Sequence, residues 1–259
     1  VGGDALIANV ALEGTSKAPI DFIVKGEIQN VADFGNLFNL NLKNWPDVAV
    51  NIAGGFDRQK ITLRKSSIAI DGKNIDLAGE YNWGGVVPNI NLNVSADDIV
   101  LADMFPGLYV HKKSKPKRKL NVFKDVPLFG EFFVGRNINV TADIKRFVVY
   151  RDFSIDDLKL RVGVNNDVAR IDLMSSVAGG TLNIGADVDI APDGNMDVIF
   201  AADGKNITVG ELLSQLKVPD LISDLPMNLE MYVRANGANL SELMQTITGP
   251  VRVYSDGVG

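Results

Sequence analysis

A chain of 259 residues is long for one ordinary domain but acceptable for one extended β protein, and 46% hydrophobic residues can supply a large apolar surface. The absence of cysteine excludes disulfides, thiol chemistry and a thiolate metal site. The formal net charge is −6, and the basic residues that stand together occupy one short segment. Nucleic-acid binding is therefore not expected, because phosphate recognition needs a basic face.

Alternation of apolar and polar residues recurs along most of the chain, which is typical of strands with one dry and one wet face. The stretch PIDFIVKGEIQ, residues 19–29, is the first clear example, and the pattern returns at 48–52, 75–83, 182–190 and 227–233. Short connections such as Asp71–Gly72, Gly84–Gly85, Asn165–Asn166 and the PDG of 192–194 favour hairpin turns. The sequence predicts a dozen or more strands, mostly in antiparallel meanders.

Helical patterns are few and short, and each directly follows a predicted strand. They lie near residues 33–40, 101–105, 209–216 and 240–247. An acid stands at or near the start of each one, where it complements the helix dipole: Asp33, Asp103, Glu211 and Glu242. We interpret these acids as helix starts and not as catalytic groups.

The segment HKKSKPKRK, residues 111–119, holds six basic side chains and the only histidine. It is polar, contains Pro116 and has no periodicity, so it predicts a surface loop or linker. We expect it to separate an N-terminal β-rich half, residues 1–110, from a C-terminal β-rich half, residues 120–259. Both ends of the chain read as strand, which suggests a piece of a longer protein.

Catalytic and metal-binding motifs are missing from the sequence. One histidine, His111, cannot form a zinc-binding histidine cluster, and no nucleophile elbow, P-loop or dinucleotide fingerprint occurs. Asp97, Asp98 and Asp103 do not have the spacing of a calcium loop. The expectation is a protein that is not an enzyme and uses no cofactor and no metal.

The strands carry more one-sided apolar surface than four short helices can cover. The fold class expected is therefore mainly β, with one or more extended, curved antiparallel sheets, and with a few short helices after strands. Two arrangements stay open: a two-sheet sandwich with a dry core, or a sheet whose open apolar groove is filled by something else. Acyl chains would suit such a groove, since no polar group recurs along it. The candidate lining residues are Phe22, Val24, Ile28, Val50, Ile52, Leu77, Tyr81, Leu182, Ile184, Val188, Leu229, Met231 and Val233.

The second half resembles the C-terminal region of AsmA-like proteins of Gram-negative bacteria. The pieces follow the order of that family: a hydrophilic loop, the VFKDVPL entry at 122–128, a strand pair over 140–157, and the AGGT turn at 178–181. The later ITVGELLSQL and ANLSELMQTITGPVRVYSDG resemble a helix followed by a closing strand. The similarity is clearest over residues 120–257 and looser over 20–110, and the entry is more aromatic than is usual in the family.

The resemblance implies a periplasmic protein of outer-membrane biogenesis, attached to the inner membrane by an anchor outside this chain. Larger relatives look like bridges that carry phospholipid along an apolar groove. Phospholipid is then the expected partner, envelope proteins are possible ones, and a scaffolding module with a closed core is the alternative. The basic residues would either contact anionic headgroups or only connect the halves: Lys112, Lys113, Lys115, Lys117, Arg118 and Lys119.

Overall fold

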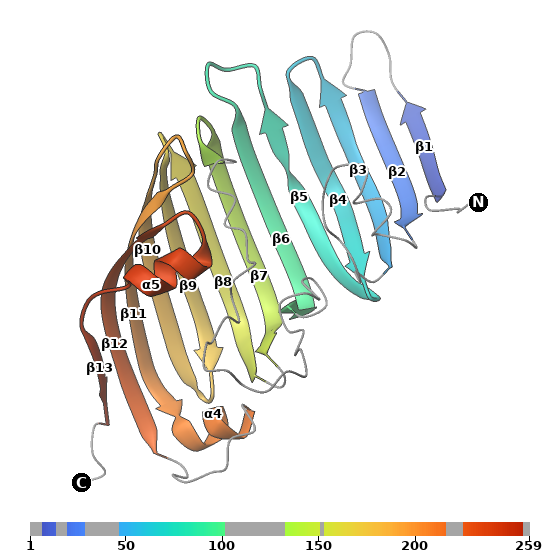
Figure 1. Cartoon of the computed structure of the whole chain (residues 1–259). Helices are drawn as coiled ribbons and strands as arrows, with labels where there is room; N and C mark the ends of the chain where they lie inside the picture. Colours follow the sequence, from blue (N-terminus) through green and yellow to red (C-terminus); the bar gives the residue numbers. More distant parts are fainter. Residues whose placement is uncertain are drawn as a thin grey trace, which may run out of the picture.

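The fold is a single large β-sheet. A computed structural model describes residues 7–13, 20–28, 47–101, 133–150, 153–215 and 225–255. All thirteen strands found there belong to one sheet whose spatial order is the order of the sequence. Figure 1 shows this twisted sheet with β1 at one edge and β13 at the other. The elements are β1 (Ile7–Glu13), β2 (Ile20–Ile28), β3 (Val48–Asp57), β4 (Lys60–Ile70), β5 (Lys73–Asn82), β6 (Asn89–Val100), β7 (Asn137–Tyr150), β8 (Phe153–Asn165), β9 (Val168–Val177), β10 (Gly180–Ile190), β11 (Met196–Thr208), α4 (Val209–Gln215), β12 (Pro226–Gly237), α5 (Leu240–Thr246) and β13 (Val251–Tyr254).

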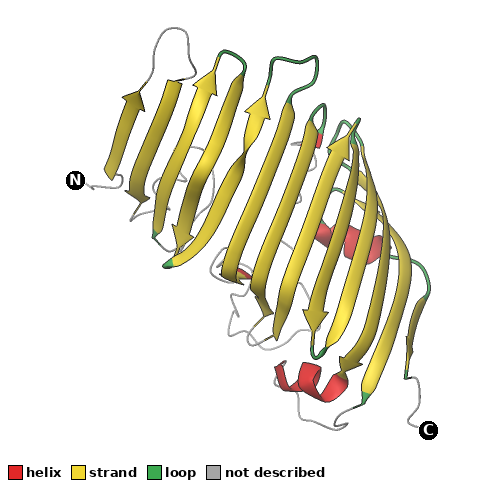
Figure 2. Ribbon diagram, turned by 180° about the vertical axis from the view of Figure 1, so that it is seen from behind, coloured by secondary structure: helices red, strands yellow, loops and turns green. Residues whose placement is uncertain are grey.

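The expected fold class is confirmed: the protein is mainly β, with one extended sheet and short helices after strands. Neighbouring strands are antiparallel, apart from the parallel pair β6 and β7. Of the two arrangements left open by the sequence, the described strands form the open sheet, and none of them builds a second sheet against it (Figure 2). The basic segment lies outside the described residues, and the strands on both sides of it join in the one sheet.

The parallel pair joins two copies of a similar sequence in register. Residues 89–95 read NINLNVS and residues 137–143 read NINVTAD, and Asn89 lies opposite Asn137. The Asn139 amide donates to Oδ1 of Asn91 at 3.1 Å, so identical side chains bond across the pair. In-register parallel strands allow such ladders because like residues stand directly beside each other.

A buried serine stabilises an irregular place in the sheet. The register shifts between Asn51 and Ala53 on β3, and between Leu63 and Ser66 on β4. Such bulges leave backbone groups without ladder partners. Ser66, 1% exposed, accepts from the Ala53 amide at 3.2 Å, and its hydroxyl lies 2.9 Å from the Arg64 carbonyl. Its side chain therefore replaces missing backbone bonds.

The two described helices follow strands at the places that the sequence predicted, and the other two predicted helices fall on residues outside the described part, apart from Leu101. α5 begins with a reciprocal cap in which Asn239 accepts from the Glu242 amide at 3.0 Å. Glu242 in turn accepts from the Ala238 amide at 2.8 Å. α5 packs on β12 and lies over one face of the sheet (Figures 1 and 2).

Buried apolar residues form two clusters at opposite ends of the strands. The first lies where β2 ends and β3 begins and continues to β8: Ile28, Val48, Ile70, Ile75, Ala96, Ile99, Ile144 and Leu158. The second lies at the other strand ends, from β7 to β11: Ile138, Val164, Ala169, Val188, Ile190 and Met196. Among the residues that the structure describes, the core is therefore two bands at the strand ends and not one central layer.

Candidate functional site

The strand register brings all thirteen candidate lining residues to the same face of the sheet, called here the apolar face. Side chains directly opposite in neighbouring strands share a face. Val24 lies opposite Ile52, and Tyr81 belongs to the same row as Val188. Residues as far apart in the sequence as Phe22 and Val233 are therefore parts of one surface.

Two uninterrupted rows of apolar residues and glycine cross the middle of this face. We call them the central rows. The first runs from β2 to β12: Phe22, Gly54, Leu63, Gly79, Leu92, Val140, Val162, Ile171, Ala186, Phe200 and Val233. The second runs from β5 to β13: Leu77, Val94, Ala142, Leu160, Leu173, Ile184, Ala202, Met231 and Val251. Because neighbouring strands lie about 4.8 Å apart, the first row is about 50 Å long.

The central rows are covered only in part. Most of their residues are half-buried, and Val251 at the β13 edge is 57% exposed. Val233 is buried at 5%, on the strand against which α5 packs. A closed core would bury the middle of the face most deeply, whereas here the deepest burial lies at the strand ends. The centre of the face is thus a long apolar strip with partly accessible side chains, seven of which also pack against the two clusters: Leu77, Val94, Ala142, Leu173, Val140, Val162 and Ile171.

The candidates differ in their burial. Ile28, Val188 and Val233 are buried, at 8%, 6% and 5%, and Tyr81 is 38% exposed. The others are half-buried: Phe22, Val24, Val50, Ile52, Leu77, Leu182, Ile184, Leu229 and Met231. Val188 belongs to the second core cluster, while Ile184 lies in the open centre of the same strand.

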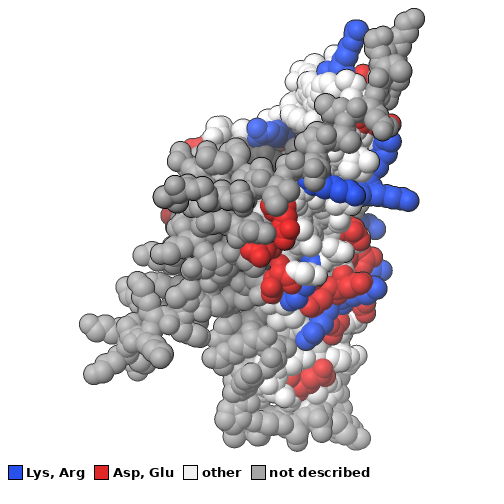
Figure 3. All heavy atoms as spheres, turned by 90° about the vertical axis from the view of Figure 1, so that its right-hand side faces the viewer, with Lys and Arg blue, Asp and Glu red and all other residues white. Residues whose placement is uncertain are grey.

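The opposite face is polar and carries charges. Figure 3 looks along the sheet from its β1 side and shows Lys, Arg, Asp and Glu gathered along one side of the sheet. Cross-strand ion pairs account for part of them: Lys145 lies 2.7 Å from Asp97, and Arg170 lies 2.9 Å from Asp187. Asp97 and Asp187 are thus structural partners of basic side chains on neighbouring strands.

These ion pairs shift the pKa values of exposed groups. Arg234 donates from Nε to Oδ1 of Asp197 at 3.0 Å, and this hydrogen bond holds the pKa of Asp197 below its ordinary value. The hydrogen bond with Asp97 raises the pKa of Lys145. Both effects come from neighbouring charge and not from burial, so they mark structural pairs and not a reactive group.

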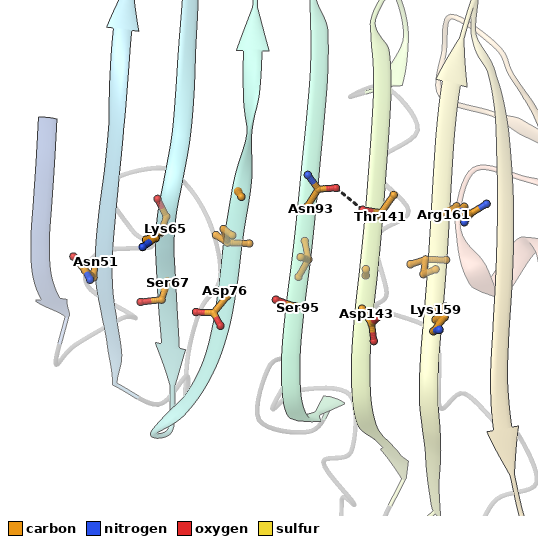
Figure 4. A pocket seen from close by; sticks show the side chains of 16 residues that line it. Asn51, Lys65, Ser67, Asp76, Asn93, Ser95, Thr141, Asp143, Lys159 and Arg161 are labelled. Carbon is orange, nitrogen blue, oxygen red and sulfur yellow. Dashed lines mark hydrogen bonds between the residues drawn. The ribbon is translucent and has the colours of Figure 1, made fainter. Parts of the chain in front are cut away.

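A hollow of about 900 Å³ lies over β3 to β8 (Figure 4). Lys65, Lys159 and Arg161 line it together with Asp76 and Asp143. Thr141 donates to Asn93 at 2.6 Å within it. Its charged and polar side chains lie on the face opposite the central rows, and four residues of the second central row also line it: Leu77, Val94, Ala142 and Leu160.

In the described part of the chain, no three His, Cys, Asp or Glu side chains stand close enough to hold a metal ion. Across those same residues, no helix is long and apolar enough to cross a membrane. The six basic candidates, Lys112 to Lys119, lie outside the described residues, so their predicted headgroup contact stays a prediction.

Sequence reasoning missed one feature of the apolar face. Trp83 continues the alternation of residues 75–83, but β5 ends at Asn82 and Trp83 lies in the loop that follows. Its ring contacts the rings of Phe56 and Tyr81, with centroids 6.0 and 5.3 Å apart. The aromatic residue types were the only signal, because the contact joins residues from different strands.

The fold and this face define a mainly β protein with a single open, mostly antiparallel sheet. Comparisons with protein families, with curated proteins and with solved structures find no match to this chain. The function must therefore be argued from the faces of the sheet themselves.

Proposed function

We propose that the apolar face binds phospholipid acyl chains and that the protein stores or conducts lipid without catalysing a reaction. The observation that carries this proposal is the pair of central rows, which stay mostly half-buried across the sheet, while no second sheet among the described strands lies against them. A half-covered apolar strip of this length is unusual for a monomer, since large apolar patches mark binding sites.

Acyl chains fit the chemistry of the strip. Its lining has no polar side chain in either central row, so it offers contact without directional bonds. Each methylene removed from water contributes about 0.8 kcal/mol. Because such contact does not depend on one exact position, a chain can move from strand to strand along the rows. The headgroup would remain in water beyond the strip.

The proposal extends to the cellular setting that the resemblance to AsmA-like proteins implies. In that setting the protein acts in the periplasm, attached to the inner membrane, in outer-membrane biogenesis. Phospholipid is the proposed ligand, and envelope proteins are the proposed protein partners. The basic segment 111–119 would contact anionic headgroups, worth about 1 kcal/mol for each basic residue near the surface.

Native mass spectrometry of freshly purified protein, followed by lipid extraction, tests the central claim. Bound phospholipid in at least a one-to-one ratio is the expected result. A lipid-free, stable protein that also fails to bind an apolar dye would contradict the proposal. That result would favour the scaffolding module that the sequence left open as the alternative.

A charge in the central rows tests the location of the ligand. Ile184→Asp is expected to remove lipid from a protein that still folds, because the side chain is half-buried and lies between the core clusters. Asn183→Asp, on the same strand with an exposed side chain, is the matched control and should retain lipid. Equal lipid content in the two variants would place the ligand elsewhere.

The basic segment has its own test. Replacing its six basic residues by serine or glutamine should weaken binding to anionic vesicles. Unchanged binding would leave the segment as a connector only.

A further inference from the structure

On strands β2 to β5, the apolar face ends in exposed side chains at the strand ends that lie beside the start of β2. Ile20, Phe56, Ile61 and Tyr81 pair across β2 to β5 and form the last row of the apolar face there. The β5–β6 loop, residues 83–88, follows directly and stands at the top of Figure 1. We call this place the aromatic rim. It consists of the half-buried Trp83 and of five exposed residues: Ile20, Phe56, Tyr81, Val86 and Val87.

The rim is held together by defined contacts. The Trp83 amide donates to the Gln59 carbonyl at 2.9 Å, which ties the β5–β6 loop to the β3–β4 turn. The Trp83 ring lies 6.0 Å from the Phe56 ring and 5.3 Å from the Tyr81 ring. A Cβ added to Gly84 would come within 2.2 Å of the Gln59 side chain. The loop therefore presents its side chains from a fixed base.

The rim exposes apolar side chains that the fold does not need to expose. Ile20 is 42% exposed and Phe56 41%, and Val86 is fully exposed at 104%. At the other end of the same strands, Ile28 and Val48 are buried at 8% and 9%. One end of these strands thus closes over a core, and the other presents its apolar residues to the surroundings.

The charges beside the rim balance. Lys60 lies 3.6 Å from Glu80, and the neighbouring turn holds one acid, Asp57, whose carboxylate accepts from the amide of the one base, Arg58. Among the described residues, the charged side chains of this turn therefore balance in sign, although the whole chain has a net charge of −6. A neutral apolar surface is suited to an uncharged or zwitterionic lipid interface, because no net electrostatic force acts between the two.

We propose that the aromatic rim inserts into the interfacial layer of a phospholipid bilayer and is the place where acyl chains enter and leave the apolar face. Entry through the rim rests on the lipid-binding function proposed above, whereas insertion does not. Tyrosine and tryptophan combine an apolar ring with a polar group and favour the membrane interface. Val86 and Val87 follow in the same loop, are 104% and 38% exposed, and would enter the acyl region. Phe56 and Tyr81 belong to the last row of the apolar face.

Tryptophan fluorescence tests insertion directly. The chain has two tryptophans, so Trp45→Phe leaves Trp83 as the sole reporter. With zwitterionic phosphatidylcholine vesicles in excess, Trp83 emission should shift to shorter wavelength and be quenched by lipids brominated on the acyl chain. Zwitterionic lipid removes attraction by the basic segment. Unchanged emission would overturn the proposal. It is also the result expected if the rim binds a protein and not a bilayer.

Matched variants locate the contact. Val86→Asp should weaken partition into these vesicles about tenfold, because one exposed aliphatic anchor is replaced by a charge. Val168→Asp makes the same change at another exposed valine, 44% exposed on β9, and should leave partition unchanged. Equal effects of the two variants, or no effect of either, would place any contact outside the rim and overturn the proposal.

Lipid entry through the rim and lipid binding on the apolar face can be tested separately. Val86→Asp should slow lipid transfer between vesicles in proportion to the lost partition, while lipid bound during expression stays bound. A variant that transfers at the original rate would overturn entry through the rim. Insertion without any bound lipid would instead retain the rim as a membrane contact and overturn the lipid-binding function.

Discussion

The two ends of strands β2 to β5 have the same residue pattern and opposite surroundings. Ile28, at the end of β2, is 8% exposed and belongs to a core cluster. Ile20, at the start of the same strand, is 42% exposed and belongs to the aromatic rim. The strands supply alternating apolar residues along their whole length, so the pattern itself does not decide where the core closes. A buried end gives stability, and an exposed end is available for contact.

The largest effect on stability is expected when the same substitution, isoleucine to alanine, is made at each of the two ends. Ile28→Ala should cost about 2–4 kcal/mol of unfolding free energy, because it leaves a cavity in a packed cluster. Ile20→Ala should cost under about 1 kcal/mol, since its side chain is already largely in water. Urea unfolding of both variants measures the difference. Equal losses would show that both ends are packed alike in solution.

An intermediate effect is expected between the two ends, at the bulges of β3 and β4. Ser66→Ala should destabilise the protein by about 1–3 kcal/mol, because the Ala53 amide loses its partner inside the sheet. Ser67→Ala, one position further and half-buried over the polar hollow, is the control. Its expected loss is within about 0.5 kcal/mol. If both variants unfold at the same denaturant concentration, the hydroxyl of Ser66 does not support the bulge.

The smallest loss of stability is expected on the polar face, where an exposed ion pair serves as a comparison for the two losses predicted above. The pKa of Asp197 is lowered by its hydrogen bond with Arg234. A lowered carboxylate pKa adds stability that is present above the unfolded value, about 3.9, and is lost as the pH falls through the folded value. Arg234→Gln should therefore reduce stability slightly at pH 7, and the difference should vanish at low pH. A difference that grows on acidification would contradict this.

Much of the architecture could be predicted from the period of the residues. The alternation in PIDFIVKGEIQ predicts a strand over residues that form β2, and Asp71 and Gly72 both have the positive φ, 50° and 73°, of a two-residue hairpin turn. Both described helices begin at the predicted places, with Glu211 and Glu242 in their first turns. These features are local, so the sequence contains the information for them.

The sequence predicted which residues share the apolar face, but not how deeply each of them is buried. The period of two assigns Ile184 and Val188 to one face of β10, and the register agrees. Period alone cannot separate them, yet Val188 is packed in a core cluster and Ile184 is half-buried. The difference depends on residues such as Ile138 and Val164, which belong to the same cluster as Val188 but come from other strands.

By itself, the sequence determined that this chain forms strands with one dry and one wet face, because alternation, turn residues and helix caps act over a few neighbouring positions. The tertiary structure decided that all the described strands join one sheet, through a parallel pair between β6 and β7. It also decided which parts of the dry face are closed into core and which remain open. Closure depends on which segments meet across the sheet, and such meetings are set by pairing between distant strands and not by local pattern.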